Sequence, residues 1–552
     1  MEILHIQNLS FSYNKSDKKA LSEVSLSVNE GEFIVICGES GSGKTTLLKL
    51  IKKELSPLGE RSGEVYFDGI PIENIDSRKS ASEIGFVMQN PDSQIVTDKV
   101  WHELAFGLEN LGLPEQVIRR RTAETASYFG ISSWYRQDTS NLSGGQKQLL
   151  NLASVMIMQP RILILDEPTS QLDPIAAEEF ITMLKKLNSE LGITILITEH
   201  RLENVFPIAD RVVVMENGRI IACDDPRKVG NEMKNHSISH GFPAAVRIFQ
   251  GLDINDRCPL TIKEGRNFLI KNYIPDPQKS INIPKNISDS FAVEAKNLWF
   301  RYEKDTDDIL KGISFKIHTN EIFSILGETG TGKTTLLNVI SGLKKAYKGG
   351  VKIFGQKLSE YKGNSLYKNK LAYLPQNPSA VFIKDSIRRD FEYLLKNYDF
   401  SEEIIENKIY EIGEKLNITS LLDKHPFDLS GGEQQKCAIG RILLCEPKIL
   451  LLDEPTKGID AFSKHELISL LKELKKAGTT ILMVTHDIEF AAQISDRCAL
   501  FFDGEIISAD YPHDFFSGNS YYTTAAFRIS KGLFKNAILC DDVINLCKEQ
   551  KQ

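Results

Sequence analysis

The chain contains Gly38-Glu39-Ser40-Gly41-Ser42-Gly43-Lys44-Thr45, which matches the pattern G-x-x-x-x-G-K-[ST] and is followed by Thr46. An apolar run at 33–37 precedes the match, and a helical pattern follows it. In that context the glycine-rich turn and the start of the helix aim backbone N–H groups at a phosphate, where the helix dipole also favours an anion. The stretch therefore predicts a strand, a phosphate-binding loop and a helix, the core of an α/β nucleotide-binding fold.

The same pattern occurs again as Gly327-Glu328-Thr329-Gly330-Thr331-Gly332-Lys333-Thr334, followed by Thr335 and preceded by an apolar run at 322–326. In each copy we expect the lysine to reach the β- and γ-phosphates and the threonine after it to bind Mg²⁺. Two matches in matching contexts make two ordinary glycine turns a remote alternative. We predict two binding sites for ATP with Mg²⁺, and we assign the residues of both stretches to them.

The second half of the chain repeats the first half, with the same motifs in the same order. Lys44 and Lys333 are 289 positions apart, and Asp166 and Asp453 are 287 positions apart. Offsets this steady indicate that a whole domain was duplicated, with few insertions between its landmarks. A chain of 552 residues is long enough for two large α/β domains, each with a core of its own.

The repeat extends beyond these motifs. Ala244-Ala245-Val246-Arg247-Ile248 is similar to Ala525-Ala526-Phe527-Arg528-Ile529, so we expect each copy to end in a small, mostly helical appendage. The stretch 274–290 is polar and contains prolines, which is typical of a linker. We expect a first nucleotide-binding domain, an appendage with the linker, a second nucleotide-binding domain and a C-terminal appendage, at residues 1–230, 231–290, 291–515 and 516–552.

Within each copy, short β-rich runs alternate with helical patterns, which indicates a parallel sheet with crossover helices. The runs at 161–165 and 193–197 are apolar enough for buried central strands. Between Gln89 and Ser143 the pattern becomes helical, and apolar residues recur on one helix face: Val100, Leu104, Leu108 and Leu111. We therefore expect a helical subdomain inserted into each α/β core.

Composition narrows the range of functions. The formal net charge is −7 with 26% charged residues, which excludes a chain-wide nucleic-acid surface. The eight cysteines form no C-x-x-C pair and no zinc-finger spacing, as expected in a reducing cytosol. We find no pattern of a signal peptide and no stretch of the ~18 apolar residues that span a bilayer, so we expect any membrane role to come through a partner.

Each copy places two carboxylates directly after an apolar strand: Asp166 and Glu167 in the first, Asp453 and Glu454 in the second. The ends of such strands are where ligands bind in open α/β sheets. We expect the aspartates to bind Mg²⁺ through water, and the glutamates to polarise the water that attacks the γ-phosphate. Because each pair follows a phosphate-binding loop, we prefer this interpretation to one of solvated turn acids.

Two further stretches separate this chain from other phosphate-loop enzymes: Leu142-Ser143-Gly144-Gly145-Gln146 and Leu429-Ser430-Gly431-Gly432-Glu433. With them the chain resembles the ATP-binding cassette (ABC) ATPases over almost all of both halves. In that family this signature opens a helix, and its serine and backbone amides grip the γ-phosphate of a nucleotide held by the opposite domain. The resemblance implies an intramolecular pair of cassettes with two composite sites, to which each signature contributes its serine, both glycines and its final residue.

The resemblance also assigns residues in pairs, one in each half. Gln89 and Gln376 are the implied Q-loop glutamines, which contact Mg²⁺ and water. His200 and His486 are the implied switch histidines, which contact the γ-phosphate. Asp173 and Asp460 are the implied D-loop aspartates, which cross between sites, and Tyr13 and Tyr302 are the tyrosines implied to stack on adenine. Since both halves keep the glutamate, the histidine and the signature, we predict two hydrolytic sites in an ATP hydrolase of the translocase type, coupled to transport.

Four stretches resemble the ATPase components of energy-coupling factor (ECF) transporters, in the version where one chain carries both cassettes: 89–96, 103–110, 198–202 and 455–460. The resemblance implies a peripheral protein at the cytoplasmic face of a prokaryotic cell membrane. Its partners would be a transmembrane scaffold subunit and a substrate-binding membrane subunit, with no nucleic acid. The implied cargo is a vitamin or a transition-metal ion, and the membrane subunit rather than this chain selects it.

The two copies differ beside their Q-loops. Val381 aligns with Gln94, and Ser379-Ala380 replaces Asp92-Ser93. We expect the two cassettes to dock differently on the scaffold protein; drift at a surface without contacts is the alternative.

Three other classes of cassette protein fit less well. The main alternative is a soluble tandem-cassette ATPase acting on ribosomes, but such proteins usually carry a long basic helical arm between the cassettes. The interval here contains Asp276-Pro277 and Asn286-Ile287-Ser288, and the overall charge is negative. DNA-repair cassette proteins carry zinc-binding cysteine pairs, which this sequence lacks. Tandem ATPases of sugar importers often have one impaired site, and neither site here is degenerate.

Overall fold

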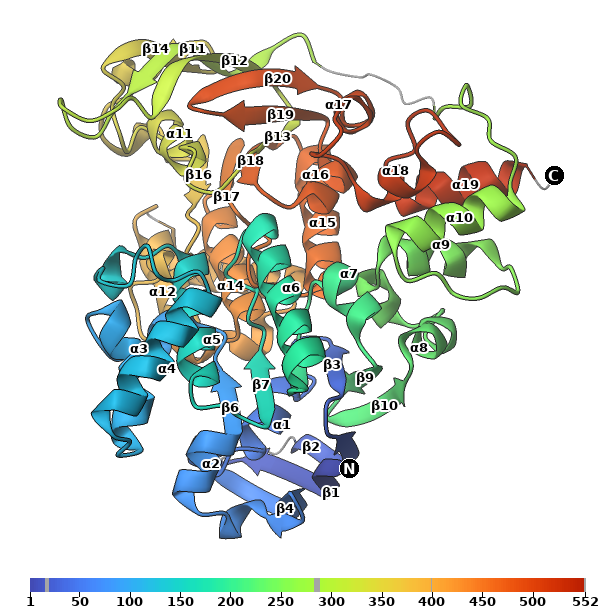
Figure 1. The fold of residues 1–552 in the computed structure, drawn as a ribbon. Helices are drawn as coiled ribbons and strands as arrows, with labels where there is room; N and C mark the ends of the chain where they lie inside the picture. Colours follow the sequence, from blue (N-terminus) through green and yellow to red (C-terminus); the bar gives the residue numbers. More distant parts are fainter. Residues whose placement is uncertain (15–18, 282–287, 399, 551–552) are drawn as a thin grey trace. The chain divides into compact units, whose positions relative to one another are not determined.

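The computed structural model describes residues 1–14, 19–281, 288–398 and 400–550. It forms two compact units, one of Met1–Thr261 with Asp460–Phe462 and the other of Ile262–Ile459 with Ser463–Gln552. Each unit contains one of the two phosphate-binding stretches, and each is described here by itself. Figure 1 shows their elements coloured along the sequence.

The first unit is built on two sheets. Its six-stranded sheet has the order β10-β9-β3-β8-β7-β6 and is parallel except at the edge pair of β9 and β10. Its four-stranded antiparallel sheet has the order β2-β1-β4-β5. The strands are β1 (Glu2–Tyr13), β2 (Lys19–Asn29), β3 (Phe33–Gly38), β4 (Gly59–Phe67), β5 (Ile70–Pro71), β6 (Ile84–Val87), β7 (Ile162–Asp166), β8 (Thr194–Thr198), β9 (Arg211–Glu216) and β10 (Arg219–Asp224).

The second unit has the same two sheets, which agrees with the predicted duplication. The orders are β16-β17-β18-β13-β19-β20, again with one antiparallel edge pair, and β12-β11-β14-β15. The strands are β11 (Phe291–Phe300), β12 (Leu310–His318), β13 (Ile322–Leu326), β14 (Lys348–Ile353), β15 (Gln356–Lys357), β16 (Leu371–Leu374), β17 (Ile449–Asp453), β18 (Thr480–Thr485), β19 (Arg497–Phe502) and β20 (Glu505–Asp510).

The central strands consist mostly of apolar residues because both faces of the parallel sheet are covered. Every residue of β3, β7 and β8 is buried. The two strands predicted at 161–165 and 193–197 are therefore confirmed, each displaced by one residue. The α/β fold class is confirmed with them.

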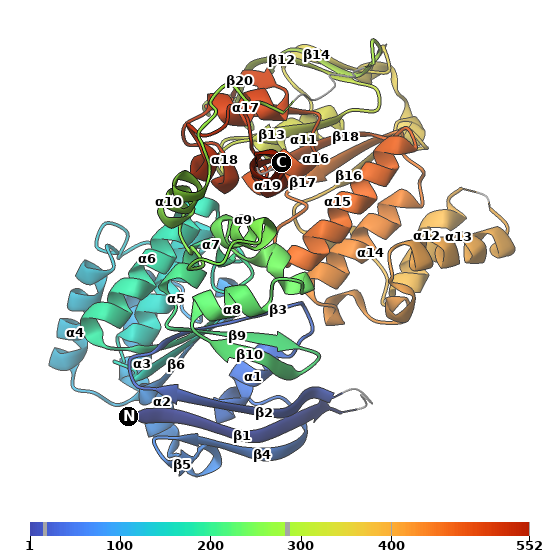
Figure 2. The same ribbon diagram turned by 90° about the vertical axis from the view of Figure 1, so that its right-hand side faces the viewer.

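A group of helices forms the predicted helical subdomain in each unit. In the first, α3 (Val100–Asn110) packs on α4 (Glu115–Tyr128) and α5 (Gly144–Met156), with Val100, Leu104 and Leu108 fully buried. In the second, α12 (Ile387–Lys396) and α13 (Glu402–Lys415) lie beside α14 (Gly431–Leu443), as Figure 2 shows. The other core helices are α1 (Lys44–Leu50), α2 (Ser77–Glu83), α6 (Pro174–Leu191), α7 (Leu202–Val205), α11 (Lys333–Ile340), α15 (Ala461–Lys476) and α16 (Ile488–Ile494).

Short helices follow each cassette core. They are α8 (Pro226–Glu232) and α9 (Ala244–Leu252) in the first unit, and α17 (Pro512–Gly518), α18 (Ala525–Ser530) and α19 (Cys540–Glu549) in the second. The segment expected as an appendage with linker divides between the units, because α10 (Ile262–Asn272) packs on α18 in the second. Part of the expected linker, residues 282–287, lies outside the described residues. None of the described helices is both long and apolar enough to cross a membrane.

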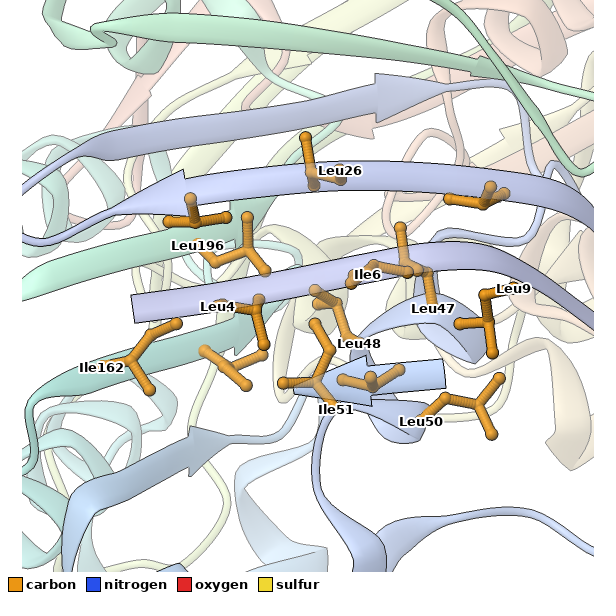
Figure 3. Close-up of a cluster of buried hydrophobic side chains, with 14 of the residues drawn as sticks. Leu4, Ile6, Leu9, Leu26, Leu47, Leu48, Leu50, Ile51, Ile162 and Leu196 are labelled. Carbon is orange, nitrogen blue, oxygen red and sulfur yellow. The ribbon is translucent and has the colours of Figure 1, made fainter. Parts of the chain in front are cut away.

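The helix that follows the first phosphate-binding loop is anchored between the two sheets of its unit. Figure 3 shows a buried cluster that joins residues of α1 and its end with residues of β1, β7 and β8. Its members include Leu47, Leu48, Leu50, Ile51, Leu4, Ile6, Ile162 and Leu196, each 0–1% exposed. Burial of each such side chain contributes about 1.5–3 kcal/mol. The position of the loop therefore depends on this apolar cluster.

We expect Leu48→Ala to lower the free energy of unfolding of the first unit by about 2–5 kcal/mol, because it removes buried methyl groups and leaves a cavity. Urea unfolding followed by circular dichroism measures the loss. Leu58→Ala is the matched control, since Leu58 is 83% exposed and should change the stability by less than about 0.5 kcal/mol. Equal losses for the two variants would contradict the anchoring role of the cluster.

Candidate nucleotide-binding sites

Each phosphate-binding stretch lies between a buried strand and a helix, β3 and α1 in the first unit and β13 and α11 in the second. The glycine before the lysine has a left-handed backbone, with φ of +99° at Gly43 and +109° at Gly332. A Cβ atom at Gly43 would lie 2.5 Å from the carbonyl oxygen of Ala20, and one at Gly332 would lie 2.6 Å from the side chain of Ile309. Both the conformation and the space therefore require glycine.

The lysine of each stretch is buried and folds back over its own loop. Lys44 Nζ donates to the carbonyl oxygens of Gly38 and Glu39, both at 2.9 Å, and Lys333 makes the equivalent two bonds at 2.8 and 2.6 Å. Burial lowers the pKa of Lys44, and the nearby Glu167 carboxylate acts in the opposite direction. Each ammonium group is thus held against the loop whose peptide N–H groups would bind phosphate.

Two other side chains of the first loop are notable. The Glu39 Oε1 atom accepts a hydrogen bond of 2.9 Å from the hydroxyl of Ser237, which lies between α8 and α9. The Ser42 hydroxyl is buried, and it has no hydrogen-bond partner among the residues that the structure describes. A buried unpaired hydroxyl inside the loop is a group that a phosphate oxygen could satisfy.

Asp166 ends β7 and lies 4% exposed at the carboxyl edge of the sheet. Its Oδ1 atom accepts two hydrogen bonds, from Thr45 Oγ1 at 3.0 Å and from Thr198 Oγ1 at 2.9 Å. Burial raises the pKa of Asp166, and the charge of the adjacent Glu167 raises it further. Carboxylate and hydroxyl oxygens are the ligands that Mg²⁺ prefers, so Thr45 and Asp166 fit that ion.

Glu167 follows directly, with a left-handed backbone of φ +44°, which is uncommon for a residue other than glycine. Its two carboxylate oxygens are held from two sides: Gln89 Nε2 donates to Oε2 at 2.6 Å, and His200 Nε2 lies 2.7 Å from Oε1. Burial acts to raise the pKa of Glu167, but the electrostatic attraction and hydrogen bond of the His200 imidazole, together with the charge of Lys44, keep that pKa below its ordinary value. The geometry brings together the predicted Q-loop glutamine, catalytic glutamate and switch histidine.

The second unit repeats the pairing of this glutamate with the switch histidine, but through different contacts. Glu454 also has a left-handed backbone, with φ +49°, and its Oε2 atom lies 2.8 Å from His486 Nδ1. The backbone N–H of His486 donates to the same oxygen at 3.2 Å. Burial acts to raise the pKa of Glu454, but the hydrogen bonds and electrostatic attraction of His486, together with the charge of Lys333, keep that pKa below its ordinary value. Within the described residues no hydrogen bond joins Gln376 to Glu454, whereas Gln89 is bonded to Glu167.

Asp453 is supported differently from Asp166. Its Oδ2 atom accepts a hydrogen bond of 3.3 Å from the hydroxyl of Tyr373 on β16, and its Oδ1 atom is buried without a partner among the described residues. Burial raises the pKa of Asp453 to about 6, although the hydroxyl of Thr334 acts in the opposite direction. An unpaired buried oxygen beside a threonine hydroxyl is again a donor set that fits Mg²⁺.

Each signature opens a helix, as the sequence predicts, and its serine is the N-terminal cap. The backbone N–H of Ser143 donates to Gln146 Oε1 at 2.9 Å, and that of Gln146 donates to Ser143 Oγ at 3.3 Å. Ser430 and Glu433 form the same capping box at the start of α14. There the Ser430 hydroxyl also donates to the Glu433 carboxylate, at 2.8 Å. This reciprocal capping satisfies two free N–H groups of each helix.

The two predicted adenine-stacking tyrosines lie beside the phosphate-binding helices. Tyr13 OH is 2.8 Å from Thr46 Oγ1, and Tyr302 OH is 3.3 Å from Thr335 Oγ1. The two residues are 41% and 54% exposed. Each ring also packs edge-on against the phenylalanine two residues before it, with ring centroids 5.1 Å apart. The Lys344 ammonium lies 5.5 Å from the centroid of the Tyr302 ring. The stacking of both rings on adenine stays a prediction.

Sequence reasoning missed several residues that hold the sites in place. Gln94, which we expected at a docking surface, also braces the Q-loop: its amide accepts from Met88 N–H at 2.8 Å and donates to the Phe86 carbonyl at 3.1 Å. The expected difference in docking stays a prediction. Val381 cannot make these bonds, so the difference between the copies has an internal consequence. The alignment of the two halves marked this position but could not give its role.

A second missed feature occurs in both units. The glutamate three residues after each switch histidine accepts a hydrogen bond from the first N–H of an appendage helix. Glu203 Oε2 accepts from Ala244 at 2.9 Å, and Glu489 Oε1 accepts from Ala525 at 2.7 Å. The similar stretches at 244–248 and 525–529 therefore share a structural reason, because each begins the helix that this glutamate caps.

Comparison with known proteins agrees with this geometry. The family model described as ABC transporter matches residues 21–170 and 310–457. A Bacillus anthracis protein named as an ABC transporter ATP-binding protein is 43% identical over 552 residues, which covers 98% of each chain. A Bacillus subtilis protein with the provisional name HMP/thiamine import ATP-binding protein YkoD is 31% identical, over 94% of this chain and 93% of its own.

Among solved structures, cbiO1 from Clostridium perfringens, described as part of the ABC transporter complex cbiONQ, is 34% identical. It covers 44% of this chain and 97% of its own length, with a TM-score of 0.38. The family match and the full-length relatives show that the chain belongs to the ABC transporter family. It is an ATP-binding subunit with two cassettes, and such subunits couple ATP hydrolysis to transport together with membrane components.

We expect Glu167→Gln and Glu454→Gln each to abolish turnover at one site and leave turnover at the other. Glutamine keeps the shape of the side chain but cannot accept a proton, which should cost about 10²–10⁴-fold in rate at the altered site. Phosphate release by the two single variants and the double variant measures this. Glu178→Gln, at an exposed position of α6, is the matched control. One inactive and one silent single variant would contradict two hydrolytic sites.

Proposed function

We propose that this chain is the ATP-hydrolysing subunit of an ECF-type importer for a vitamin or a transition-metal ion. The observation that carries the proposal is the similarity, over 94% of the chain, to a protein whose name assigns it to HMP/thiamine import. The stretches at 89–96 and 198–202, which resemble the single-chain ECF ATPases, support it. The chain would act as a translocase subunit at the cytoplasmic face of a prokaryotic cell membrane.

The contacts within each unit support a hydrolytic mechanism. Glu167 would accept a proton from the attacking water: His200 and Gln89 hold its two oxygens in place, and a pKa below the ordinary value keeps the carboxylate ionised. Lys44 would exchange its two loop carbonyls for phosphate oxygens. Thr45, Gln89 and Asp166 would hold Mg²⁺, as would Thr334, Gln376 and Asp453; when bound, the ion neutralises phosphate charge.

We also propose that the two cassettes pair within the chain, so that each site is completed by the signature of the other half. Ser143 with Gly145 and Ser430 with Gly432 would then contact the γ-phosphate. Covalent linkage raises the effective concentration of one cassette for the other, which supports pairing inside one chain. The parts that we propose for this arrangement keep the boundaries 1–230, 231–290, 291–515 and 516–552.

A pull-down of the tagged full-length chain from host membranes in mild detergent tests the proposal. We expect mass spectrometry to identify a small polytopic scaffold protein and a second polytopic protein, since a peripheral ATPase needs membrane partners to move a solute. The second protein would also indicate the cargo. The control is the same pull-down with the untagged chain.

The alternative class gives a different result in the same experiment. A soluble tandem-cassette ATPase that acts on ribosomes would recover ribosomal proteins from the soluble fraction and no polytopic protein. That result would overturn the importer proposal and leave only the ATP-hydrolysing activity of the family. Recovery of a scaffold with transporters for larger solutes such as sugars would instead contradict the proposed class of cargo.

A further inference from the structure

The metal-binding aspartates of the two units receive their hydrogen bonds from opposite neighbouring strands. In the first unit the donor Thr198 lies on β8, directly paired with Asp166 across the sheet. In the second unit Val484 occupies the paired position opposite Asp453 and has no hydroxyl to donate. The donor there is Tyr373 on β16, the strand on the other side of β17.

The register shows that these positions correspond. Phe86 on β6 pairs with the residue two before Asp166, and Tyr373 on β16 pairs with the residue two before Asp453. At these two strand positions the first unit has Thr198 and Phe86, and the second unit has Val484 and Tyr373. Thr45 of the phosphate-binding helix also donates to Asp166, but each half of the duplicated chain has one hydroxyl on a neighbouring strand that donates to its aspartate. The two halves differ in the strand that supplies this hydroxyl and in the carboxylate oxygen that accepts it.

The surroundings explain why one donor is needed. Asp166 and Asp453 are 4% and 1% exposed, so water cannot hold their carboxylates in one orientation. A buried acceptor without a partner costs free energy, and a carboxylate that rotates presents no fixed oxygen to a ligand. The backbone N–H of Glu167 bonds to both the hydroxyl and the carbonyl oxygen of Thr198, at 2.9 and 3.1 Å. Among the described residues, the Glu454 N–H bonds to the Val484 carbonyl alone, at 2.9 Å.

We propose that Tyr373 is the positioning residue of the metal-binding carboxylate in the second nucleotide site, in the role that Thr198 has in the first. Tyr373 fixes Oδ2 of Asp453 and leaves the buried Oδ1 for the hydration shell of a divalent ion. The inference rests on the proposed Mg²⁺-ATP sites. If Tyr373 has this role, the two sites have equivalent metal ligands, but different residues hold the aspartate in place. One substitution can then weaken one site alone.

The test measures metal binding by the full chain rather than turnover. Mn²⁺, used in place of Mg²⁺, is titrated in the presence of a non-hydrolysable ATP analogue, and electron paramagnetic resonance measures the free ion. We expect two sites in the unaltered chain. Tyr373→Phe should weaken one of them by about tenfold, as loss of a hydrogen bond to a metal ligand typically does. Thr198→Val should weaken the other, and the double variant both.

Moving the hydroxyl donor to the other neighbouring strand distinguishes a positioning role from a general destabilisation of the site. Val484→Thr added to Tyr373→Phe should restore the affinity, because a hydroxyl then faces Asp453 as Thr198 faces Asp166. Phe86→Tyr added to Thr198→Val should do the same in the first site. Tyr361→Phe is the matched control, since its hydroxyl donates to the Ile353 carbonyl at 3.0 Å, outside the site.

The possible results distinguish a failure of this inference from a failure of the proposed Mg²⁺-ATP function. Two intact sites in Tyr373→Phe, or an equal loss in Tyr361→Phe, would overturn the role of Tyr373 while the ATP sites stand. Failure of Val484→Thr to restore binding would overturn the equivalence of the two donors. If the unaltered chain binds no metal with the nucleotide, the proposed Mg²⁺-ATP function fails, and this inference fails with it.

Discussion

In each unit two adjacent carboxylates lie buried at the carboxyl end of a central parallel strand, where neither is exposed by more than 8%. Such groups are stable only where donors or cations replace the water that they have lost. The lysine on its loop, the histidine after the next strand and the hydroxyls of neighbouring strands supply those partners. The positions of the loop, the Q-loop and the switch strand all follow from this requirement.

The duplication allows one half of the chain to serve as a control for the other. Most residues that would meet phosphate or water are the same in both halves; in the loops Ser40 and Ser42 correspond to Thr329 and Thr331. Several residues that support them differ. Gln94 stabilises one Q-loop through hydrogen bonds that Val381 cannot make in the other. The strand hydroxyl that donates to the aspartate belongs to Thr198 in the first half and to Tyr373 in the second. A supporting hydrogen bond can come from any neighbouring strand or loop that reaches the acceptor. A group that reacts with the phosphate or the water, by contrast, must lie at one fixed position relative to them.

The appendages are connected to the sites by contacts as well as by sequence. Glu203 and Glu489 cap the appendage helices and lie three residues after the switch histidines. In the first unit Ser237 also reaches Glu39 of the phosphate-binding loop. These hydrogen bonds connect the helices α9 and α18 to the segments that follow the switch histidines, and the segment before α9 to the first phosphate-binding loop.

The sequence by itself determined the fold class and the duplication, and it marked the residues proposed to react. These features depend on local spacing: a loop of fixed length, two acids after an apolar strand and a serine that caps a helix. Only the tertiary structure decided that Thr198 and Tyr373, 32 and 80 positions from their aspartates, support them. It alone placed α10 in the second unit. The physical reason is that a hydroxyl or an apolar helix face fits many partners, and only packing selects one.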